Sequence, residues 1–221
     1  MPTPPPPTVT RTRFLAFGDS ITAGTTSPAV LRGLSAGPPQ SYPFNLQSLL
    51  SARFSSQAIN VFNEGLPLEE ASGGVRRLPV VLRNASPEVV ILLHGANDLT
   101  GPTVVARTLG FLNTMTRDAR FAGATVFLCT LPPQRPGGSR VNDPQTVANY
   151  NAGVRDLARD EGTTLVDLSR ELDLSLIGVD GLHPTEAGYE RMAQMFLAII
   201  RSQFERAPTT TLLVSPGRGW P

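Results

Sequence analysis

The stretch Val89-Val90-Ile91-Leu92-Leu93 consists of five consecutive apolar residues, and His94-Gly95-Ala96-Asn97-Asp98 follows it directly. A continuous apolar run of this length is typical of a parallel strand buried on both faces. Similar short runs occur on either side of it, at residues 14–17, 59–62, 125–128 and 164–166. The sequence therefore predicts five strands of a mostly parallel sheet.

Segments with a period near 3.6 residues separate several of these runs. They cover residues 42–54, 104–121, 146–159 and 185–204. In the first of them, Leu46, Leu49, Leu50 and Phe54 recur on one side, as expected for a helix that packs on a sheet. The last one should be capped at its start by Thr185 or the loop before it. Strands alternating with helices predict an α/β domain with right-handed crossovers.

The composition indicates how many domains the chain forms and which kinds of partner it can bind. The 221 residues are 40% hydrophobic and 17% charged, which indicates one globular domain, and we assign it to residues 12–206. Residues 1–11 are Pro-rich and predict an extended spacer, while residues 207–221 form a C-terminal tail. The 19 basic residues are all Arg and face 18 acidic residues, so the balanced charge argues against a nucleic-acid binder.

Cysteine and histidine are too scarce for the common metal sites. One cysteine, Cys129, excludes an internal disulfide and a Cys-rich zinc site, and its apolar surroundings indicate core packing. With two histidines in all, we expect no metal and no other cofactor. The longest apolar runs fall far short of the roughly 20 residues that span a bilayer, so we expect no transmembrane segment.

The Pro-rich start also bears on where the protein resides. It lacks the charged and apolar regions of a signal peptide, and such spacers often join an anchor or another module to a catalytic domain. We therefore expect a secreted or periplasmic protein, or a lipoprotein, whose signal has been removed. A cytoplasmic protein is the alternative.

Polar residues at the carboxyl ends of parallel strands meet at one edge of the sheet, where ligands bind. The first run ends in Gly18-Asp19-Ser20-Ile21-Thr22, and we predict Ser20 as a nucleophile exposed by this tight turn. The alternative is an ordinary turn in which Asp19 or Ser20 caps a helix.

A serine hydroxyl needs a base to take its proton, and imidazole suits that task near neutral pH. In Asp180-Gly181-Leu182-His183, the carboxylate lies three residues before the histidine. Asp180 can orient the ring through one nitrogen while the other faces Ser20. The alternative is a surface histidine that caps the following helix.

The oxyanion of an acyl-transfer intermediate needs donors that are already in place. We predict three of them: the side chain of Asn97, the main-chain N–H of Gly65 and the backbone of Ser20. The alternative for the Asn97 segment is a turn or helix start, with Asp98 as the cap of that element.

These segments together resemble the SGNH hydrolase superfamily, also called the GDSL lipases and esterases. Gly18–Thr22 matches its first block, Gly65 its glycine block, Gly95-x-Asn97-Asp98 its asparagine block, and Asp180-Gly-Leu-His183-Pro184 its last block. The blocks occur in order over residues 14–204. One departure is the run Leu66-Pro67 after Gly65, where a more flexible stretch is usual.

The resemblance implies a flavodoxin-like three-layer α/β/α sandwich whose five-stranded parallel sheet has the order 2-1-3-4-5. It implies Ser20 as nucleophile, His183 as base and Asp180 as the residue that orients it. It also implies an oxyanion hole made by Ser20, Gly65 and Asn97.

We therefore predict a serine esterase that acts on a small-molecule or carbohydrate ester through an acyl-enzyme. No broad apolar lid is evident, which favours short acyl groups such as acetyl over long lipid chains. A lysophospholipase or thioesterase is the alternative within the enzyme class, and a catalytically silent binding module is the alternative outside it.

Substrate contacts are the least readable part of the sequence. We assign Asp19 and His94 to the substrate site, and expect the long Gly/Pro-rich loops 25–41 and 131–140 to shape its entrance. Arg32, Arg135 and Arg140 lie in these loops. They either hold an anionic or sugar-bearing substrate or are simply solvated.

Overall fold

The computed structural model describes residues 5–27, 40–99 and 104–207, and its centre is a five-stranded parallel sheet. The strands are β2 (Arg13–Gly18), β3 (Asn60–Gly65), β4 (Val89–Leu93), β5 (Thr125–Cys129) and β6 (Thr164–Val166). Their order is β3-β2-β4-β5-β6, which is the order 2-1-3-4-5 that the resemblance implies. All five residues of β4 are buried, as its continuous apolar run predicts.

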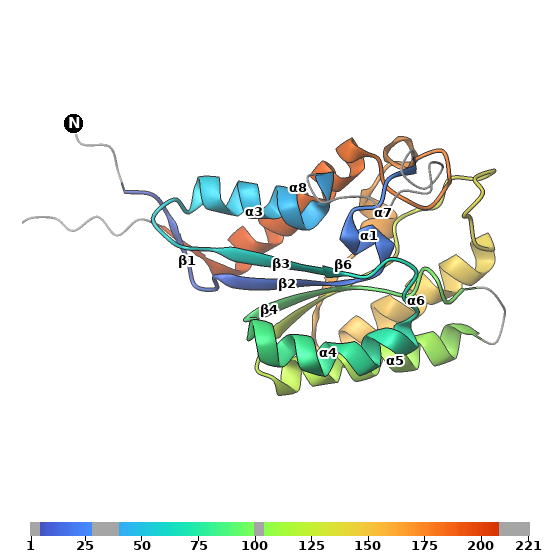
Figure 1. Ribbon diagram of the computed structural model, residues 1–221, viewed down its shortest axis with the longest axis horizontal. Helices are drawn as coiled ribbons and strands as arrows, with labels where there is room; N and C mark the ends of the chain where they lie inside the picture. Colours follow the sequence, from blue (N-terminus) through green and yellow to red (C-terminus); the bar gives the residue numbers. More distant parts are fainter. Residues whose placement is uncertain (1–4, 28–39, 100–103, 208–221) are drawn as a thin grey trace, which may run out of the picture.

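Helices cover both faces of the sheet, so the predicted three-layer sandwich is confirmed (Figure 1). Helices α3 (Tyr42–Arg53) and α8 (Glu186–Phe204) pack together on one face. Helices α4 (Ala71–Ala85), α5 (Val104–Phe121) and α6 (Pro144–Asp160) cover the other. The short elements α1 (Ser20–Ala23), α7 (Leu168–Glu171) and the 3₁₀ turn η2 (Leu174–Leu176) complete the connections.

The predicted helices lie within two residues of the observed bounds at each end. Their apolar stripes face the core: Leu46, Leu50 and Phe54 are fully buried beside the sheet. Thr185 is the N-cap of α8, where its Oγ1 accepts a hydrogen bond from the Gly188 amide at 3.1 Å. The predicted cap is therefore confirmed.

Helix α4 is absent from the sequence-based prediction. Gly73, Gly74 and Pro79 all have poor helix propensity, and they conceal the pattern. A signal is nevertheless present, because the buried positions 71, 74, 78, 81 and 82 follow helical spacing. Gly74 has a packing reason: a Cβ there would press on the His94 ring and the Met115 sulfur. The glycine thus lets α4 approach the sheet closely.

A second, two-stranded sheet joins the two ends of the domain. Strand β1 (Thr8–Val9) pairs antiparallel with β7 (Glu205–Arg206). Val9 is buried, and the Gln57 side chain bonds both its N–H and its carbonyl oxygen. The last residues of the predicted spacer are therefore held against the domain. Residues 1–4 of the spacer and 208–221 of the tail lie outside the described residues.

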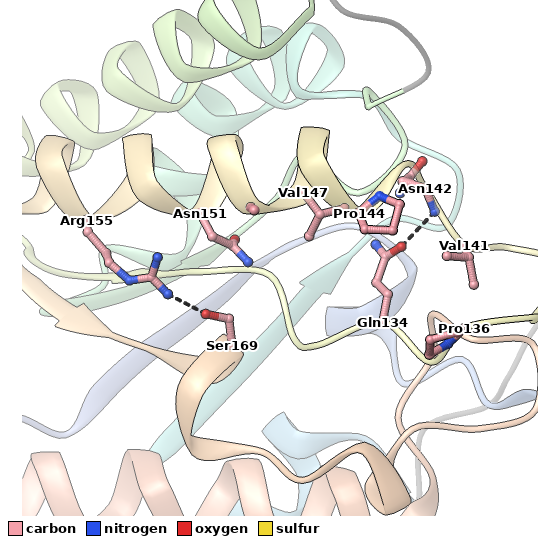
Figure 2. Close-up of a pocket in the computed structure, with 10 residues that line it drawn as sticks. Gln134, Pro136, Val141, Asn142, Pro144, Val147, Asn151, Arg155 and Ser169 are labelled. Carbon is pink, nitrogen blue, oxygen red and sulfur yellow. Dashed lines mark hydrogen bonds between the residues drawn. The ribbon is translucent and has the colours of Figure 1, made fainter.

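The loop after β5 is anchored on helix α6 by one buried amide. Asn151 accepts from the Leu131 N–H and donates to the Leu131 carbonyl oxygen. Beyond this anchor the loop stands away from the helix and leaves a cavity of about 340 Å³ (Figure 2). In the described part of the chain, no helix is long and apolar enough to cross a membrane.

Candidate active site

Ser20 is the first residue of α1, directly after strand β2. The Asp19 carboxylate accepts a hydrogen bond from the Ile21 amide at 3.0 Å and so caps this one-turn helix. A side chain at Gly18 would collide with the Leu93 carbonyl oxygen, so glycine is what allows β2 to run this close to β4 here. Asp19 therefore caps the helix, and Ser20, the candidate nucleophile, is the first residue of that helix.

The structure brings Ser20, His183 and Asp180 into one chain of hydrogen bonds. Ser20 Oγ lies 2.9 Å from His183 Nε2, and His183 Nδ1 lies 2.6 Å from Asp180 Oδ2. Each of the three residues exposes 3% of its surface or less. Because the Asp180 carboxylate only accepts, it selects the tautomer with hydrogen on Nδ1, which leaves Nε2 free to accept from the serine hydroxyl.

Asp180 is held as a carboxylate by its surroundings. Burial alone would raise its pKa, but hydrogen bonds from the His183 ring, from the Leu182 and His183 amides and from Ser27 outweigh that effect. The pKa of Asp180 therefore lies well below its usual range. A charged Asp180 favours the imidazolium that forms when His183 takes a proton.

Two of the three predicted oxyanion donors have other partners in the structure. Asn97 Nδ2 donates to the Glu69 carbonyl oxygen at 3.0 Å, which uses one of its two hydrogens. The Gly65 amide donates to the side chain of Asn63 at 3.0 Å. Gly65 also has a packing role, because a Cβ there would collide with the backbone of Ala23 in α1. Glycine at this position lets α1 rest on the end of β3.

Asp19 and His94, which we expected to contact substrate, are both fully buried. Burial raises the pKa of Asp19, and the nearby His94 and the Ile21 amide offset only part of that effect. His94 accepts from the Gly95 amide through Nδ1 and donates through Nε2 to Glu69 at 3.2 Å. In this arrangement neither side chain has surface that a ligand could contact.

Asp98 caps helix α4, and not an element that begins in the loop after β4. Both of its carboxylate oxygens accept from the Ala71 amide, at 3.0 and 3.1 Å. Ala71 is the first residue of α4, whose N-cap residue Glu70 makes no side-chain capping bond. Asp98 therefore ties the loop after β4 to the start of α4.

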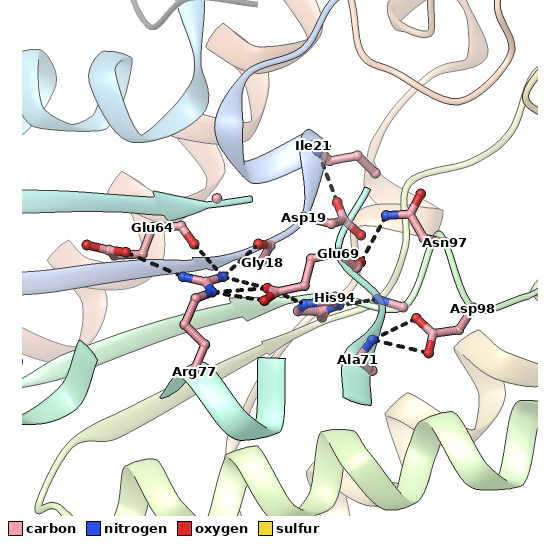
Figure 3. Close-up of polar contacts among 12 residues, drawn as sticks. Gly18, Asp19, Ile21, Glu64, Glu69, Ala71, Arg77, His94, Asn97 and Asp98 are labelled. Atoms are coloured by element: carbon pink, nitrogen blue, oxygen red, sulfur yellow. Dashed lines mark hydrogen bonds and ion pairs between the residues drawn. The ribbon is translucent and has the colours of Figure 1, made fainter. Parts of the chain in front are cut away.

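Beneath the candidate site, Arg77 of α4 makes the densest set of polar contacts (Figure 3). Its Nη2 lies 2.6 Å from the Glu69 carboxylate and also donates to the carbonyl oxygens of Glu64, at 3.0 Å, and Gly18, at 3.4 Å. The guanidinium lies over the Phe17 ring, 4.1 Å from its centroid. Arg77 thus links the ends of β2 and β3.

Glu69 extends this link to the loop after β4. Its carboxylate bonds Arg77 and His94, and its carbonyl oxygen accepts from Asn97. Burial would raise the pKa of Glu69, but the hydrogen bonds from His94 and Arg77 lower it to about 2. Glu69 and Arg77 are absent from the sequence-based prediction, because Arg77 lies in the unpredicted helix α4 and Glu69 directly precedes its N-cap residue.

Three large apolar residues are exposed next to residues of the site. Leu66 is 47% exposed, and its amide donates to the Gly18 carbonyl oxygen at 2.9 Å. Leu68 precedes Glu69 with φ 66°, a left-handed conformation that is uncommon for leucine, and Val179 precedes Asp180. Apolar surface therefore lies on the β3 side and beside the Asp180 loop.

The arginines expected at the site entrance differ in the hydrogen bonds that they make. Arg140 donates through Nη2 to Asn97 Oδ1 at 3.4 Å, and its backbone amide bonds the Asp180 carbonyl oxygen. Arg135 bonds the Gly181 carbonyl oxygen through its backbone amide. Arg32 and most of loop 25–41 lie outside the described residues.

Cys129 lies in the core and not among the residues of the candidate site. Cys129 is buried, and burial raises the pKa of its thiol, so it packs in the core as predicted. Among residues 5–27, 40–99 and 104–207, no cluster of three His, Cys, Asp or Glu could hold a metal ion.

Comparisons with known proteins agree on one family. The sequence profile of the GDSL-like lipase/acylhydrolase family matches residues 16–191. The chain is 27% identical over 149 residues to the multidomain esterase of Ruminococcus flavefaciens, covering 62% of this chain but only 19% of that protein. It is also 27% identical over 154 residues to esterase TesA of Pseudomonas aeruginosa, covering 66% of this chain and 73% of TesA.

The fold of this chain is also similar to those of solved structures. One of them is a carbohydrate acetylesterase family member from Sinorhizobium meliloti, with a TM-score of 0.72 and 19% sequence identity. The match covers 86% of this chain and 98% of that structure.

Replacing Arg77 by Leu should lower kcat for a small ester by roughly tenfold to a hundredfold and change KM little, because the loops after β2 and β3 lose their common anchor. Arg77→Lys should recover only part of the rate, since an ammonium cannot reach Glu69 and both carbonyl oxygens as a planar fork does. The exposed neighbour Arg76 provides the matched control, Arg76→Leu. Equal effects of the two leucine variants on kcat would contradict this role.

The low pKa of Glu69 makes its contribution to stability depend on pH. Its pKa is about 2 in the folded protein against 4.5 for an unperturbed Glu, so the stabilisation is complete above about pH 4.5 and is lost as pH falls towards 2. The difference in unfolding free energy between the wild type and Glu69→Gln should therefore shrink from about pH 5 to about pH 3 in urea titrations. A difference that stays constant over this range would refute the assignment.

Proposed function

This chain belongs to the GDSL-like lipase/acylhydrolase family, a family of carboxylic ester hydrolases, and from that premise we propose that it hydrolyses esters through an acyl-enzyme on Ser20. The observation that carries the proposal is the hydrogen-bonded chain from Ser20 Oγ through His183 to Asp180, with distances of 2.9 and 2.6 Å. The first distance lets His183 Nε2 take the Ser20 proton without rearrangement, and the second lets Asp180 hold the ring in place.

In the first half of the reaction, Ser20 Oγ attacks the ester carbonyl carbon while His183 Nε2 takes the hydroxyl proton. The tetrahedral intermediate collapses as His183 returns that proton to the leaving alcohol. Water then attacks the acyl-enzyme, again with His183 as base, and releases the acid and free Ser20. Asp180 keeps the ring oriented and stabilises its charged form throughout.

The oxyanion is stabilised by the Ser20 amide and by the second hydrogen of Asn97 Nδ2. Glu69 and Arg140 support this assignment, since their contacts hold both ends of the Asn97 amide in one orientation. Gly65 can join as the third donor only by exchanging its bond to Asn63 for one to the oxyanion.

The substrate we propose is a short-chain acyl ester, with an acetylated carbohydrate as the preferred case. A similar solved structure is described as a carbohydrate acetylesterase family member, and a curated relative as a multidomain esterase. The alternative is a longer apolar acyl group, as in lysophospholipids or thioesters. The exposed Leu66, Leu68 and Val179 favour this alternative, because they would give such a chain an apolar surface.

Ser20→Ala should reduce kcat/KM for 4-nitrophenyl acetate by at least about a thousandfold, because the acyl group then has no nucleophile to accept it. Ser175→Ala, at an exposed serine of η2, is the matched control and should keep full activity. Circular dichroism would establish that both variants are folded. Retention of most of the activity by a folded Ser20→Ala protein would disprove the assignment.

A series of 4-nitrophenyl esters separates the two substrate classes. We expect kcat/KM to be highest for acetate or butanoate and to fall by about tenfold or more at dodecanoate. A steady rise with chain length would instead favour the lysophospholipid or thioester alternative.

A further inference from the structure

We propose that a groove on the β5 side of the site binds the sugar rings of a carbohydrate ester's leaving group, with Gln134 and Arg140 as hydrogen-bond donors. This inference rests on the proposed function and adds the location and residues of the leaving-group site. The groove joins two hollows that share the residues Val141 and Asn142.

The first hollow adjoins the catalytic residues. Its volume is about 240 Å³, and its lining includes Asn97, Arg140 and Leu182, the neighbour of His183. Asn142 fixes its outer wall, because Asn142 Nδ2 donates to the Ala96 carbonyl oxygen at 3.2 Å. A group that leaves Ser20 and takes its proton from His183 therefore lies close to this hollow.

The second hollow is the 340 Å³ cavity between helix α6 and the loop after β5. Pro136, Val141, Pro144 and Val147 give it apolar walls against which the C–H faces of a sugar ring can pack. Arg155 forms part of its far end, where it bonds Ser169 (Figure 2). Arg155 also bonds Asp167.

Gln134 supplies an unused donor to this cavity. Its Oε1 accepts from the Asn142 amide at 2.7 Å, while its Nε2 is buried and has no hydrogen-bond partner among the described residues. Figure 2 shows the amide nitrogen on the side of Val147, within the cavity lining. A buried donor without a partner is costly, and a ligand oxygen at this place removes that cost.

The chemistry of the lining favours hydroxyl and ether oxygens over an acyl chain. Among the described residues that line the two hollows none is acidic, and the polar ones are amides, serines and two arginines. The Arg140 guanidinium has no ion-pair partner in the described residues; its recorded side-chain contact is the 3.4 Å bond to Asn97. Arg155 already bonds Asp167 and Ser169, so the donors left for a ligand are Gln134 Nε2 and the Arg140 guanidinium. These two donors need acceptors, and an alkyl chain provides none.

Strand order separates this groove from the exposed Leu66, which lies on the β3 side of the site. Leu66 follows β3, on one side of strand β2, whereas Asn97 and the loop to α6 follow β4 and β5, on the other side of β2. An ester bound at Ser20 can therefore direct its acyl group towards β3 and its alcohol along the groove.

Two variants test the groove in different ways. Gln134→Glu keeps the acceptor for the Asn142 amide but replaces the orphan donor by an acceptor, and Ala148→Trp adds bulk from the exposed face of α6. The readouts are the ratio of kcat/KM for acetylated xylo-oligosaccharide to that for 4-nitrophenyl acetate, at about pH 8, and calorimetric binding of xylotetraose. Each variant should lower the ratio and the affinity by about tenfold.

Gln145→Glu, at an exposed glutamine of α6 outside the lining, is the matched control and should change neither readout. Unchanged ratio and affinity in both groove variants, or no measurable xylotetraose binding by an active wild type, would overturn the groove. A wild type that binds xylotetraose at the groove but cleaves neither ester would refute the proposed function and leave the groove standing.

Discussion

The ion pair between Arg77 and Glu69 is the contact on which the geometry of the candidate site depends. Ion pairs with little exposure stabilise a fold only when further hydrogen bonds compensate for lost hydration. Here both partners have them: Arg77 bonds the carbonyl oxygens of Gly18 and Glu64, and Glu69 bonds His94 and Asn97. One guanidinium and one glutamate thus connect the loops after β2, β3 and β4, which carry the candidate nucleophile and oxyanion donors.

The remaining part of the site is anchored from the opposite side. The loop after β5 bonds the backbone of the Asp180 segment twice, through the amides of Arg135 and Arg140. Gly138 allows that loop to approach closely, since a Cβ there would collide with the Asp180 carbonyl. The loop that forms the proposed groove therefore also supports the carboxylate that orients His183, so substrate contacts and catalytic geometry share one scaffold.

Much of this architecture can be predicted from the sequence because it depends on local signals. Continuous apolar runs mark the buried strands, and the polar turn after β2 marks Ser20 as a candidate. Asp180 and His183 lie beyond α7 and η2, and their three-residue spacing marks them as candidates. Helix α4 escapes prediction because Gly73, Gly74 and Pro79 weaken its local signal while packing on the sheet stabilises it. The partners of Gly65, Asp19 and His94 depend on how the chain folds around them, and burial cannot be inferred from their residue types.

The central claim is that these loops present Ser20 to an ester carbonyl beside donors for its oxyanion. A crystal structure of the protein after reaction with a small fluorophosphonate tests this most directly, because the phosphonate oxygen stands in for the oxyanion. We predict phosphorus bonded to Ser20 Oγ, with one phosphonate oxygen within hydrogen-bond distance of the Ser20 amide and Asn97 Nδ2. An adduct on another residue, or an oxygen directed away from both donors, would contradict the account.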